Sequence, residues 1–134
     1  MKLTRACFYA LYALEYLAGR PPGPPVASHH IAAARGIPER FVLKVLKPLV
    51  SAGLLLSLKG PNGGYRLARP AARITLLEVV EAVDGPLPVH SPLALEGGER
   101  LEARLGAVCQ EVADLVRNRL GEARVSDLVG KGKG

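Results

Sequence analysis

The residues best suited to chemistry in this chain are its lysines and arginines, because they are concentrated in one segment. Residues 26–73 hold eight Lys or Arg residues and a single acidic residue, Glu39, whereas residues 74–134 hold seven basic and ten acidic residues. The excess positive charge of the chain, +6 overall, therefore lies mainly in the first of these segments. A basic segment with almost no acid is suited to binding phosphate groups. Ordinary surface charge is the alternative, but it does not explain why acids are scarce here and plentiful afterwards.

The sequence contains no residue pattern typical of an enzyme. No serine, cysteine or histidine lies in a nucleophile context, and no phosphate loop or metal-ligand motif is found. His29 and His30 are adjacent, but neighbouring residues of a helix point about 100° apart and cannot chelate one ion together. Contact with phosphate or solvent is the expected role of this pair. We predict no catalytic residue, no metal ligand and no cofactor.

Length and cysteine content fit one domain in a reducing compartment. A chain of 134 residues can bury a core without cross-links, and two cysteines, Cys7 and Cys109, are too few for a disulfide scaffold. No apolar run is long enough to span a membrane. Glu15 interrupts the early apolar run, which argues against a signal peptide. We expect a cytoplasmic protein with no membrane partner.

The basic segment begins with the pattern of a helix-turn-helix. Ser28 is a plausible N-cap for a helix over residues 28–35, Gly36 suits a left-handed C-terminal cap, and Pro38 suits the first position of a second helix. The small and apolar residues at the expected helix crossing are Ala32, Gly36, Val42 and Val45. This spacing allows two helices to pack across a tight turn.

The second helix, predicted from Pro38 to about Ala52, has an apolar and a basic face. The residues expected to point inward are Phe41, Val42, Val45, Leu46 and Leu49. Those expected to point outward are Glu39, Arg40, Leu43, Lys44 and Lys47. A basic face on the helix after the turn is typical of a helix that enters a DNA major groove, although a solvated helix is the alternative. Pro48 predicts a bend or an early end.

A β-hairpin is predicted next, with strands over residues 54–59 and 65–69. Asn62-Gly63 favours a turn with positive φ at both residues. We expect Leu54, Leu56 and Leu58 to pack on the domain, while Lys59 and Arg66 flank a glycine-rich tip that can approach a phosphate or groove floor closely. A helix-turn-helix followed by such a hairpin is a winged helix.

The remaining elements flank this unit. Residues 2–18 predict a helix that is apolar nearly all round, with a stripe of Leu3, Cys7, Ala10, Leu14 and Leu17. Such a helix packs against several neighbours, which suggests its own core and a partner subunit. Residues 19–25 form a proline-rich loop, and Thr75 with Glu78 predicts a capping box for a helix over residues 75–83. A glycine- and proline-rich loop, residues 85–98, contains His90.

A long helix is predicted from Glu99 to about Leu120. Its apolar residues alternate at spacings of four and three, as in a coiled-coil seam: Leu101, Leu105, Val108, Val112 and Leu115. Because little sequence remains to cover this seam, we expect it to pack on its twin in a homodimer; packing within one subunit is the alternative. Cys109 could be a redox switch or an inert thiol. Residues 125–129 could form a last turn, and we expect residues 130–134 to be disordered.

Several motifs resemble the Rrf-two family of bacterial winged-helix regulators, which contains IscR, NsrR and CymR. They are Lys2-Leu3-Thr4 with Tyr9-Ala10, Ile31-Ala32 with Gly36-Ile37, the wing from Gly53 to Ala68 with Gly60-Pro61-Asn62-Gly63-Gly64-Tyr65, and the run from Ile74 to Gly85. The resemblance implies a homodimer crossed through long C-terminal helices and inverted-repeat operators. It also implies recognition helices in successive major grooves and wing tips in the minor groove, with Lys59 at the inserting position.

The best-known sensor of the family is an iron–sulfur cluster held by three cysteines in the loop before the long helix. The corresponding residues 85–98 contain no cysteine, and only His90, Glu96 and Glu99 offer substitutes nearby. A cluster needs several thiolates or substitutes at close spacing. We therefore expect a regulator without a cluster, of the CymR sort.

These observations predict a mainly α protein with a small β-hairpin: a winged helix-turn-helix unit (1–84), a sensor-type loop (85–98), a dimerisation helix (99–121) and a tail (122–134). The function expected is that of a homodimeric DNA-binding transcriptional repressor, with a winged-helix protein adapter as the alternative. Arg40 and Lys44 are expected to meet bases, and Lys47, Ser28 and Thr4 to meet phosphates. The full set of predicted DNA contacts is Thr4, Ser28, His29, Pro38, Glu39, Arg40, Lys44, Lys47, Lys59, Gly60, Asn62, Gly63 and Arg66.

Overall fold

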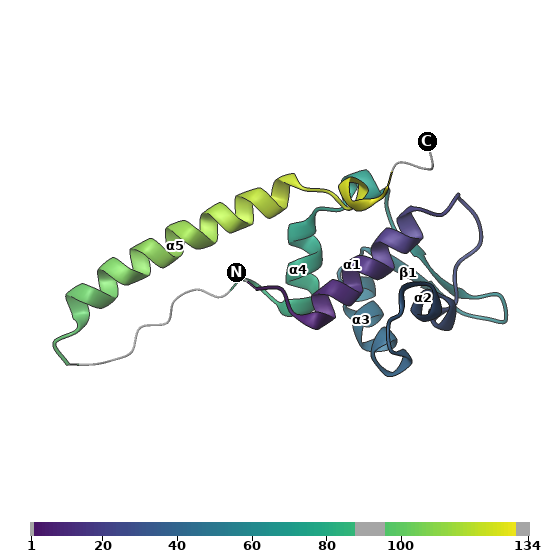
Figure 1. The fold of residues 1–134 in the computed structure, drawn as a ribbon, viewed down its shortest axis with the longest axis horizontal. Coiled ribbons are helices and arrows are strands. Elements are labelled where there is room, and N and C mark those ends of the chain that lie inside the picture. Colours follow the sequence, from purple (N-terminus) through teal and green to yellow (C-terminus); the bar gives the residue numbers. More distant parts are fainter. Residues whose placement is uncertain (1, 88–95, 131–134) are drawn as a thin grey trace.

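The computed structural model describes residues 2–87 and 96–130, which form five α-helices, one hairpin and two short 3-10 helices (Figure 1). In chain order the elements are α1 (Arg5–Ala18), α2 (Ser28–Arg35), α3 (Glu39–Ser51), β1 (Leu55–Leu58), β2 (Gly64–Leu67), η1 (Ala71–Arg73), α4 (Leu76–Asp84), α5 (Glu99–Glu122) and η2 (Val125–Leu128). The predicted fold class, mainly α with a small hairpin and a long C-terminal helix, is confirmed. His90 and residues 131–134 lie outside the described residues, so the expectations for them stay predictions.

Helix α1 is the element around which the others pack. It contacts α2, α3, α4, β2 and η2, as expected for a helix that is apolar nearly all round. Most of its predicted stripe is buried, from Cys7 to Leu17, with Ala13 added. Phe8 and Tyr12 remain 46% and 47% exposed, so one flank of α1 has no cover within the described chain.

The turn between α2 and α3 has the conformation that the sequence predicts. Gly36 adopts the left-handed conformation (φ +65°), and the N–H of Ile37 donates to the carbonyl of Ala32 over 3.0 Å. Ala32 is buried where the two helices cross. Only a residue without Cβ takes this backbone conformation at little cost.

The beginnings of both helices differ from the prediction by one residue. Ala27, not Ser28, is the N-cap of α2, and the Ser28 side chain makes no capping bond. Ala27 is extended because Val26, just before it, is hydrogen-bonded to the hairpin, so the helix can begin at Ser28 directly. Pro38 is the N-cap of α3 rather than its first helical residue.

Helix α3 continues through Pro48 to Ser51, so the expectation of an early end is wrong. Val42, Val45, Leu46 and Leu49 are all buried, and the burial of Leu49 after the proline favours continued helix. Phe41, expected inward, is only half-buried and its ring stacks on Tyr9 with centroids 6.3 Å apart.

The hairpin presents a different face to the domain from the one predicted. Leu55 is buried, whereas Leu56 and Leu58 are 42% and 37% exposed, so the prediction that these two pack inward is wrong. Leu54 is buried too, but its N–H donates to the carbonyl of Leu49 and it therefore belongs to the turn after α3. The strand alternation starts at Leu55 for this reason, which reverses the two faces.

The turn of the hairpin also differs from the prediction. Positive φ occurs at Gly60 (+105°) and Gly64 (+153°), not at Asn62 and Gly63, because Leu58 pairs with Gly64 across a loop of five residues. A Cβ atom on Gly63 would collide with the carbonyl oxygen of Leu58. The glycines are therefore required by a longer turn that folds back on its own strand.

A short bridge fixes the hairpin to the helix-turn-helix. The N–H of Val26 donates to the carbonyl of Tyr65 over 2.9 Å, and the N–H of Tyr65 donates to the carbonyl of Val26 over 2.8 Å. Gly64 lies so close that a Cβ atom on it would collide with the Val26 carbonyl oxygen. The hairpin is thus held as a wing beside α2 and α3.

Two arginines of the basic segment hold elements together instead of facing solvent freely. Arg35 of α2 makes two bonds to Glu15 of α1, at 2.7 and 3.2 Å, and the hydrogen bond raises the pKa of Arg35. Arg69, after the wing, pairs with Glu78 of α4 at 2.5 Å. Both acids come from outside residues 26–73.

The C-terminal part of the chain returns to the winged unit. The capping box of Thr75 and Glu78 is confirmed, Gly85 ends α4, and the predicted last turn is η2. Val125 is fully buried, and its N–H donates to the carbonyl of Ile74 over 2.9 Å. None of the described helices is apolar over the length needed to cross a bilayer.

Replacing Gly64 with Ala tests the bridge between wing and helix-turn-helix. The added methyl group must displace the Val26 backbone at a position whose φ already disfavours a side chain, so we expect a loss of about 2–3 kcal/mol in the free energy of unfolding. Urea denaturation measures this loss. Gly23→Ala, where the nearest atom to the new Cβ is 3.8 Å away, is the control. Equal stability of the two variants would contradict the account.

The Glu78 carboxylate gives a pH-dependent prediction. Burial raises the pKa of Glu78, but the hydrogen bond from the Thr75 N–H and the pairing with Arg69 together lower it below its ordinary 4.5. A carboxylate of this kind stabilises the fold above that pH, and its contribution is lost as the pH falls through the lower, folded-state pKa.

We therefore expect Glu78→Gln to cost about 1 kcal/mol at pH 7 and to unfold with a shallower pH dependence below pH 4.5 than the unmodified protein. Thermal unfolding followed by circular dichroism between pH 3 and 7 measures both. Glu122→Gln, at an exposed acid of α5, is the control. A Glu78→Gln curve parallel to that of the unmodified protein throughout would refute the assignment.

Candidate nucleic-acid interface

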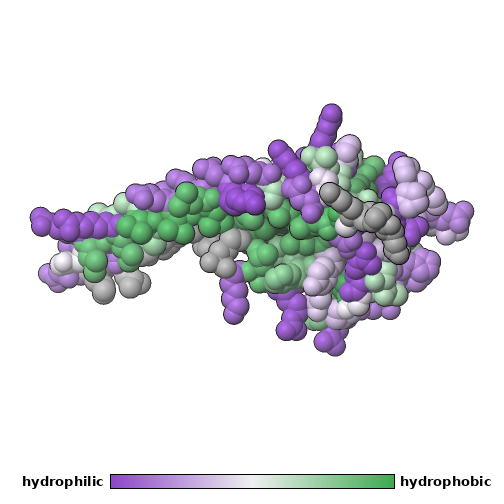
Figure 2. Space-filling model, turned by 45° about the horizontal axis from the view of Figure 1, so that its top comes forward, coloured by the Kyte–Doolittle hydropathy of each residue, from purple (hydrophilic) through white to green (hydrophobic). Residues whose placement is uncertain are grey.

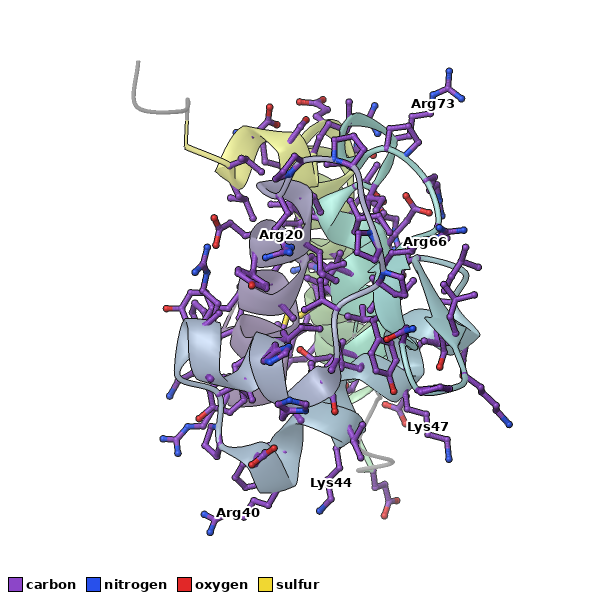
Figure 3. All side chains as sticks on the ribbon, turned by 90° about the vertical axis from the view of Figure 1, so that its right-hand side faces the viewer. Arg20, Arg40, Lys44, Lys47, Arg66 and Arg73 are labelled. Carbon is purple, nitrogen blue, oxygen red and sulfur yellow. The ribbon has the colours of Figure 1, made fainter. Side chains whose placement is uncertain are left out.

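The exposed side of α3 carries a row of four residues at helical spacing. Arg40, Leu43, Lys44 and Lys47 are all exposed and follow the i, i+3, i+4, i+7 pattern, while the opposite side of the helix is buried in the core. Figure 3 shows Arg40, Lys44 and Lys47 projecting away from the body of the molecule. We call these four residues the α3 face.

The cations of the α3 face are not neutralised within the described part of the chain. None of the carboxylates there forms an ion pair with Arg40, Lys44 or Lys47, nor with Lys59, Arg66 or Arg73. Glu39 is exposed in the first turn of α3, where an acid favours the helix dipole. An anion that approaches this face therefore meets cations whose charge is available.

An aromatic pair supports one side of the α3 face. The Arg40 guanidinium carbon lies 4.9 Å and the Lys44 Nζ 5.8 Å from the centroid of the Phe41 ring, which in turn stacks on Tyr9 of α1. Cation–π contacts of this kind restrict flexible side chains without cancelling their charge. The two cations thus lie against the same ring.

A hollow of about 280 Å³ lies beside this aromatic pair. It is lined by Arg5, Ala6, Tyr9, Phe41, Lys44 and Val45. Arg5 is not among the predicted contacts, although it is exposed at the first position of α1. The helix dipole disfavours a cation at the first position of a helix. An arginine at such a position is therefore the sequence signal that could have identified Arg5 as a candidate contact.

Three predicted DNA contacts lie at the beginnings of α1 and α2, and they differ in exposure and in hydrogen bonding. His29 is exposed and its ring centroid lies 4.2 Å from that of His30, while Ser28 is half-buried. The Thr4 hydroxyl accepts from the N–H of Cys7 and donates to the Asp84 carboxylate over 2.5 Å. Thr4 therefore caps α1 in the structure, and its contact with phosphate stays a prediction.

The wing supplies a second group of predicted contacts. Lys59, Gly60 and Asn62 are exposed at its tip, Arg66 is exposed on β2, and Gly63 is half-buried. In Figure 3 Arg66 lies above the α3 face on the same side as Lys47, whereas Arg73 lies at the far end of the molecule. The structure brings the α3 cations together and leaves Arg73 apart from them.

The long helix α5 exposes the predicted seam. Its C-terminal part packs on α4, where Arg117 pairs with Glu81 at 2.9 Å, and the rest projects away from the body (Figure 1). The exposed fractions of the seam residues run from 42% to 68%: Leu101, Leu105, Val108, Val112 and Leu115. Figure 2 shows an apolar strip along this arm. A row of exposed apolar residues of this kind is typical of interaction sites.

Comparison with known proteins agrees with this geometry. The Rrf2 family model, described as an iron-dependent transcriptional regulator, matches residues 3–131. Rv1287 of Mycobacterium tuberculosis, named as an HTH-type transcriptional regulator, is 38% identical over 87 residues, which are 65% of this chain and 54% of that protein. Protein aau3 of Rhizobium meliloti is 42% identical over 85 residues, 63% of this chain and 54% of its own. The chain thus spans about half the length of the curated relatives it matches.

Solved structures show the same fold. The global cysteine regulator CymR of B. subtilis superposes with a TM-score of 0.75 and 25% identity, with 96% of this chain and 95% of that one covered. IscR of T. potens gives a TM-score of 0.74 at 23% identity, covering 96% and 85%. The resemblance that the sequence motifs carried is therefore confirmed: the chain belongs to the Rrf2 family of transcriptional regulators, with a DNA-binding winged-helix fold.

Proposed function

We propose that this chain acts as a homodimeric, sequence-specific transcriptional repressor that binds an inverted-repeat operator without an iron–sulfur cluster. The observation that carries the proposal is the α3 face, whose three cations have no carboxylate partner among the described residues, on a helix whose other side is buried. A helix of this kind after the turn of a helix-turn-helix fits a DNA major groove. The proposal assigns DNA binding to residues 1–84 and dimerisation to residues 99–121.

The chemistry of the side chains divides the contacts into two kinds. Arg40 can donate two hydrogen bonds to guanine O6 and N7, and Lys44, one turn further along α3, can reach a neighbouring base edge. Lys47 and Ser28 suit phosphates, which position the protein without reading sequence. Lys59 at the wing tip suits the minor groove, where lysine is a weaker inserter than arginine.

Dimerisation through α5 is supported by the uncovered seam. The helix of 24 residues is about 36 Å long, and its projecting part carries the apolar strip without any cover from the described chain. Two seams with alternating spacings of four and three can pack knobs into holes. A dimer formed in this way would hold two α3 faces on one duplex.

The residues of this chain do not fit the iron–sulfur cluster of the family. The structure places Cys7 in a buried cluster between α1 and α4, where burial, with a smaller effect of Asp84, raises the pKa of its thiol to about 11. A thiol with that pKa is protonated at neutral pH and is a poor ligand. Cys109 lies on α5, and residues 85–98 contain no cysteine. The thiolates that a cluster needs are therefore missing.

We propose repression, rather than activation, because a dimer bound across a promoter would block access to it. A protein that covers a promoter through two major-groove contacts excludes other proteins from the same stretch of DNA. Transcription in vitro from a promoter that carries the selected operator tests this assignment, and we expect less transcript as protein is added. An increase would instead indicate an activator.

Lys44→Ala tests whether the α3 face reads bases. We expect the affinity for a duplex selected from a random-sequence pool to fall by about tenfold or more, with a smaller loss for random DNA, because a base contact contributes mainly to specific binding. Fluorescence anisotropy at several salt concentrations measures both. Equal losses would show that Lys44 touches only phosphate.

Lys47→Ala is the matched comparison on the same face. It should weaken both duplexes alike and reduce the slope of log affinity against log salt by about 0.9, as the loss of one phosphate contact requires. If the affinity of the unmodified protein for DNA barely changes with salt, the DNA-binding proposal fails and a winged-helix adapter becomes the better reading.

Val108→Glu tests the seam. We expect the dimer to dissociate and operator affinity to fall by at least tenfold, because a buried carboxylate in the seam has no partner and the two half-sites lose their linkage. Sedimentation velocity gives the mass and anisotropy the affinity. Ala103→Glu, an exposed residue on the opposite side of α5, is the control. A dimeric Val108→Glu protein would contradict dimerisation through this helix.

A further inference from the structure

Leu43 is the one apolar member of the α3 face. It is 55% exposed and lies three residues after Arg40 and four before Lys47, so its side chain stands among cations. The other three positions of the face carry charges that suit DNA. A leucine side chain among them cannot bind phosphate or donate a hydrogen bond to a base, so any contact it makes with a ligand must be apolar.

The fold does not need an apolar side chain at this position. Leu43 belongs to neither hydrophobic cluster of the described residues. The contact of α3 with the core is made by Val42, Val45, Leu46 and Leu49, all of which are 2% exposed or less. A polar residue at position 43 would therefore leave the core intact and avoid the unfavourable hydration of a leucine. If an apolar group of a ligand covers this side chain, apolar surface is removed from water, and this favours binding.

We infer that Leu43 contacts the C5-methyl group of a thymine in the major groove and so selects an A·T pair at one position of each half-site. This inference rests on the proposed function, because α3 must enter the groove for the contact to form. The thymine methyl is the one apolar group that the four standard bases present there, and apolar side chains recognise it. Arg40 and Lys47, on either side of Leu43 along the helix, would contact DNA and hold the leucine against the base edges.

Replacing thymine with deoxyuridine tests the inference directly. Deoxyuridine keeps the Watson–Crick pair and removes only the methyl group. The probe is the duplex that the unmodified protein selects from a random-sequence pool, with each thymine of a half-site replaced in turn. We expect one position in the half-site at which the change weakens binding about fourfold, the amount that corresponds to one buried methyl or methylene group.

The Leu43→Ala variant identifies the protein side of the contact. With this variant, the thymine and deoxyuridine duplexes should bind equally at the sensitive position, since the side chain that reads the methyl group is gone. Leu128→Ala, at a leucine that is 43% exposed in η2 outside the α3 face, should keep the full difference. Circular dichroism and urea unfolding verify that both variants fold.

The outcomes separate this inference from the proposed function. If the unmodified protein prefers its selected duplex over random DNA but tolerates deoxyuridine at every position, the Leu43 inference is overturned and the proposed function stands. A deoxyuridine effect that persists in Leu43→Ala also overturns it, because the methyl group is then read by another residue. If no sequence is selected from the pool, the proposed function fails and the inference fails with it.

Discussion

The burial of one side of α3 is the interaction on which the rest of this structure depends. Val42, Val45, Leu46 and Leu49 lock the helix against the core, so its other side must face solvent with a fixed orientation. The charged residues divide in the same way. Arg35 pairs with Glu15 and Arg69 pairs with Glu78, and these two ion pairs hold elements together. In contrast, no carboxylate in the described part of the chain pairs with the α3 cations. The result is a rigid and unneutralised face, which is suited to binding phosphate groups.

A second consequence concerns the length of DNA that could be contacted, since a single α3 face could reach only a short stretch of a duplex. The arm formed by α5 departs from the winged unit, and its apolar strip is exposed along the projecting part (Figure 2). The C-terminal part of α5 is fixed on α4 through the Arg117–Glu81 pair, and Val125 returns the chain to the core. The arm is therefore attached firmly to the unit that carries the α3 face, so that joining two arms would also set the separation of two such faces.

Local signals in the sequence predicted most of the fold. The features that were predicted wrongly, or not at all, depend on contacts between residues far apart in the sequence. The cap at Gly36, the Thr75–Glu78 capping box and the helical periodicity of α5 each depend on residues within about one turn of one another, and the structure confirms the cap, the capping box and the helix. Ser28 is not a cap because Val26 pairs with Tyr65, 39 residues away. The wing faces are reversed because the N–H of Leu54 donates to the carbonyl of Leu49, so that the strand begins only at Leu55. Similarly, the exposed cations of α3 were predicted from helical spacing, whereas the place of Arg5 beside Lys44 depends on how α1 crosses α3.

Chemical protection of guanine N7 on the selected duplex tests the central claim most directly, because dimethyl sulfate reports on the major groove that α3 is proposed to enter. We expect two protected segments that are related by the symmetry of the inverted repeat and centred one helical turn, about 10 base pairs, apart. Protection of a single segment, or binding that leaves every major-groove guanine reactive, would contradict it.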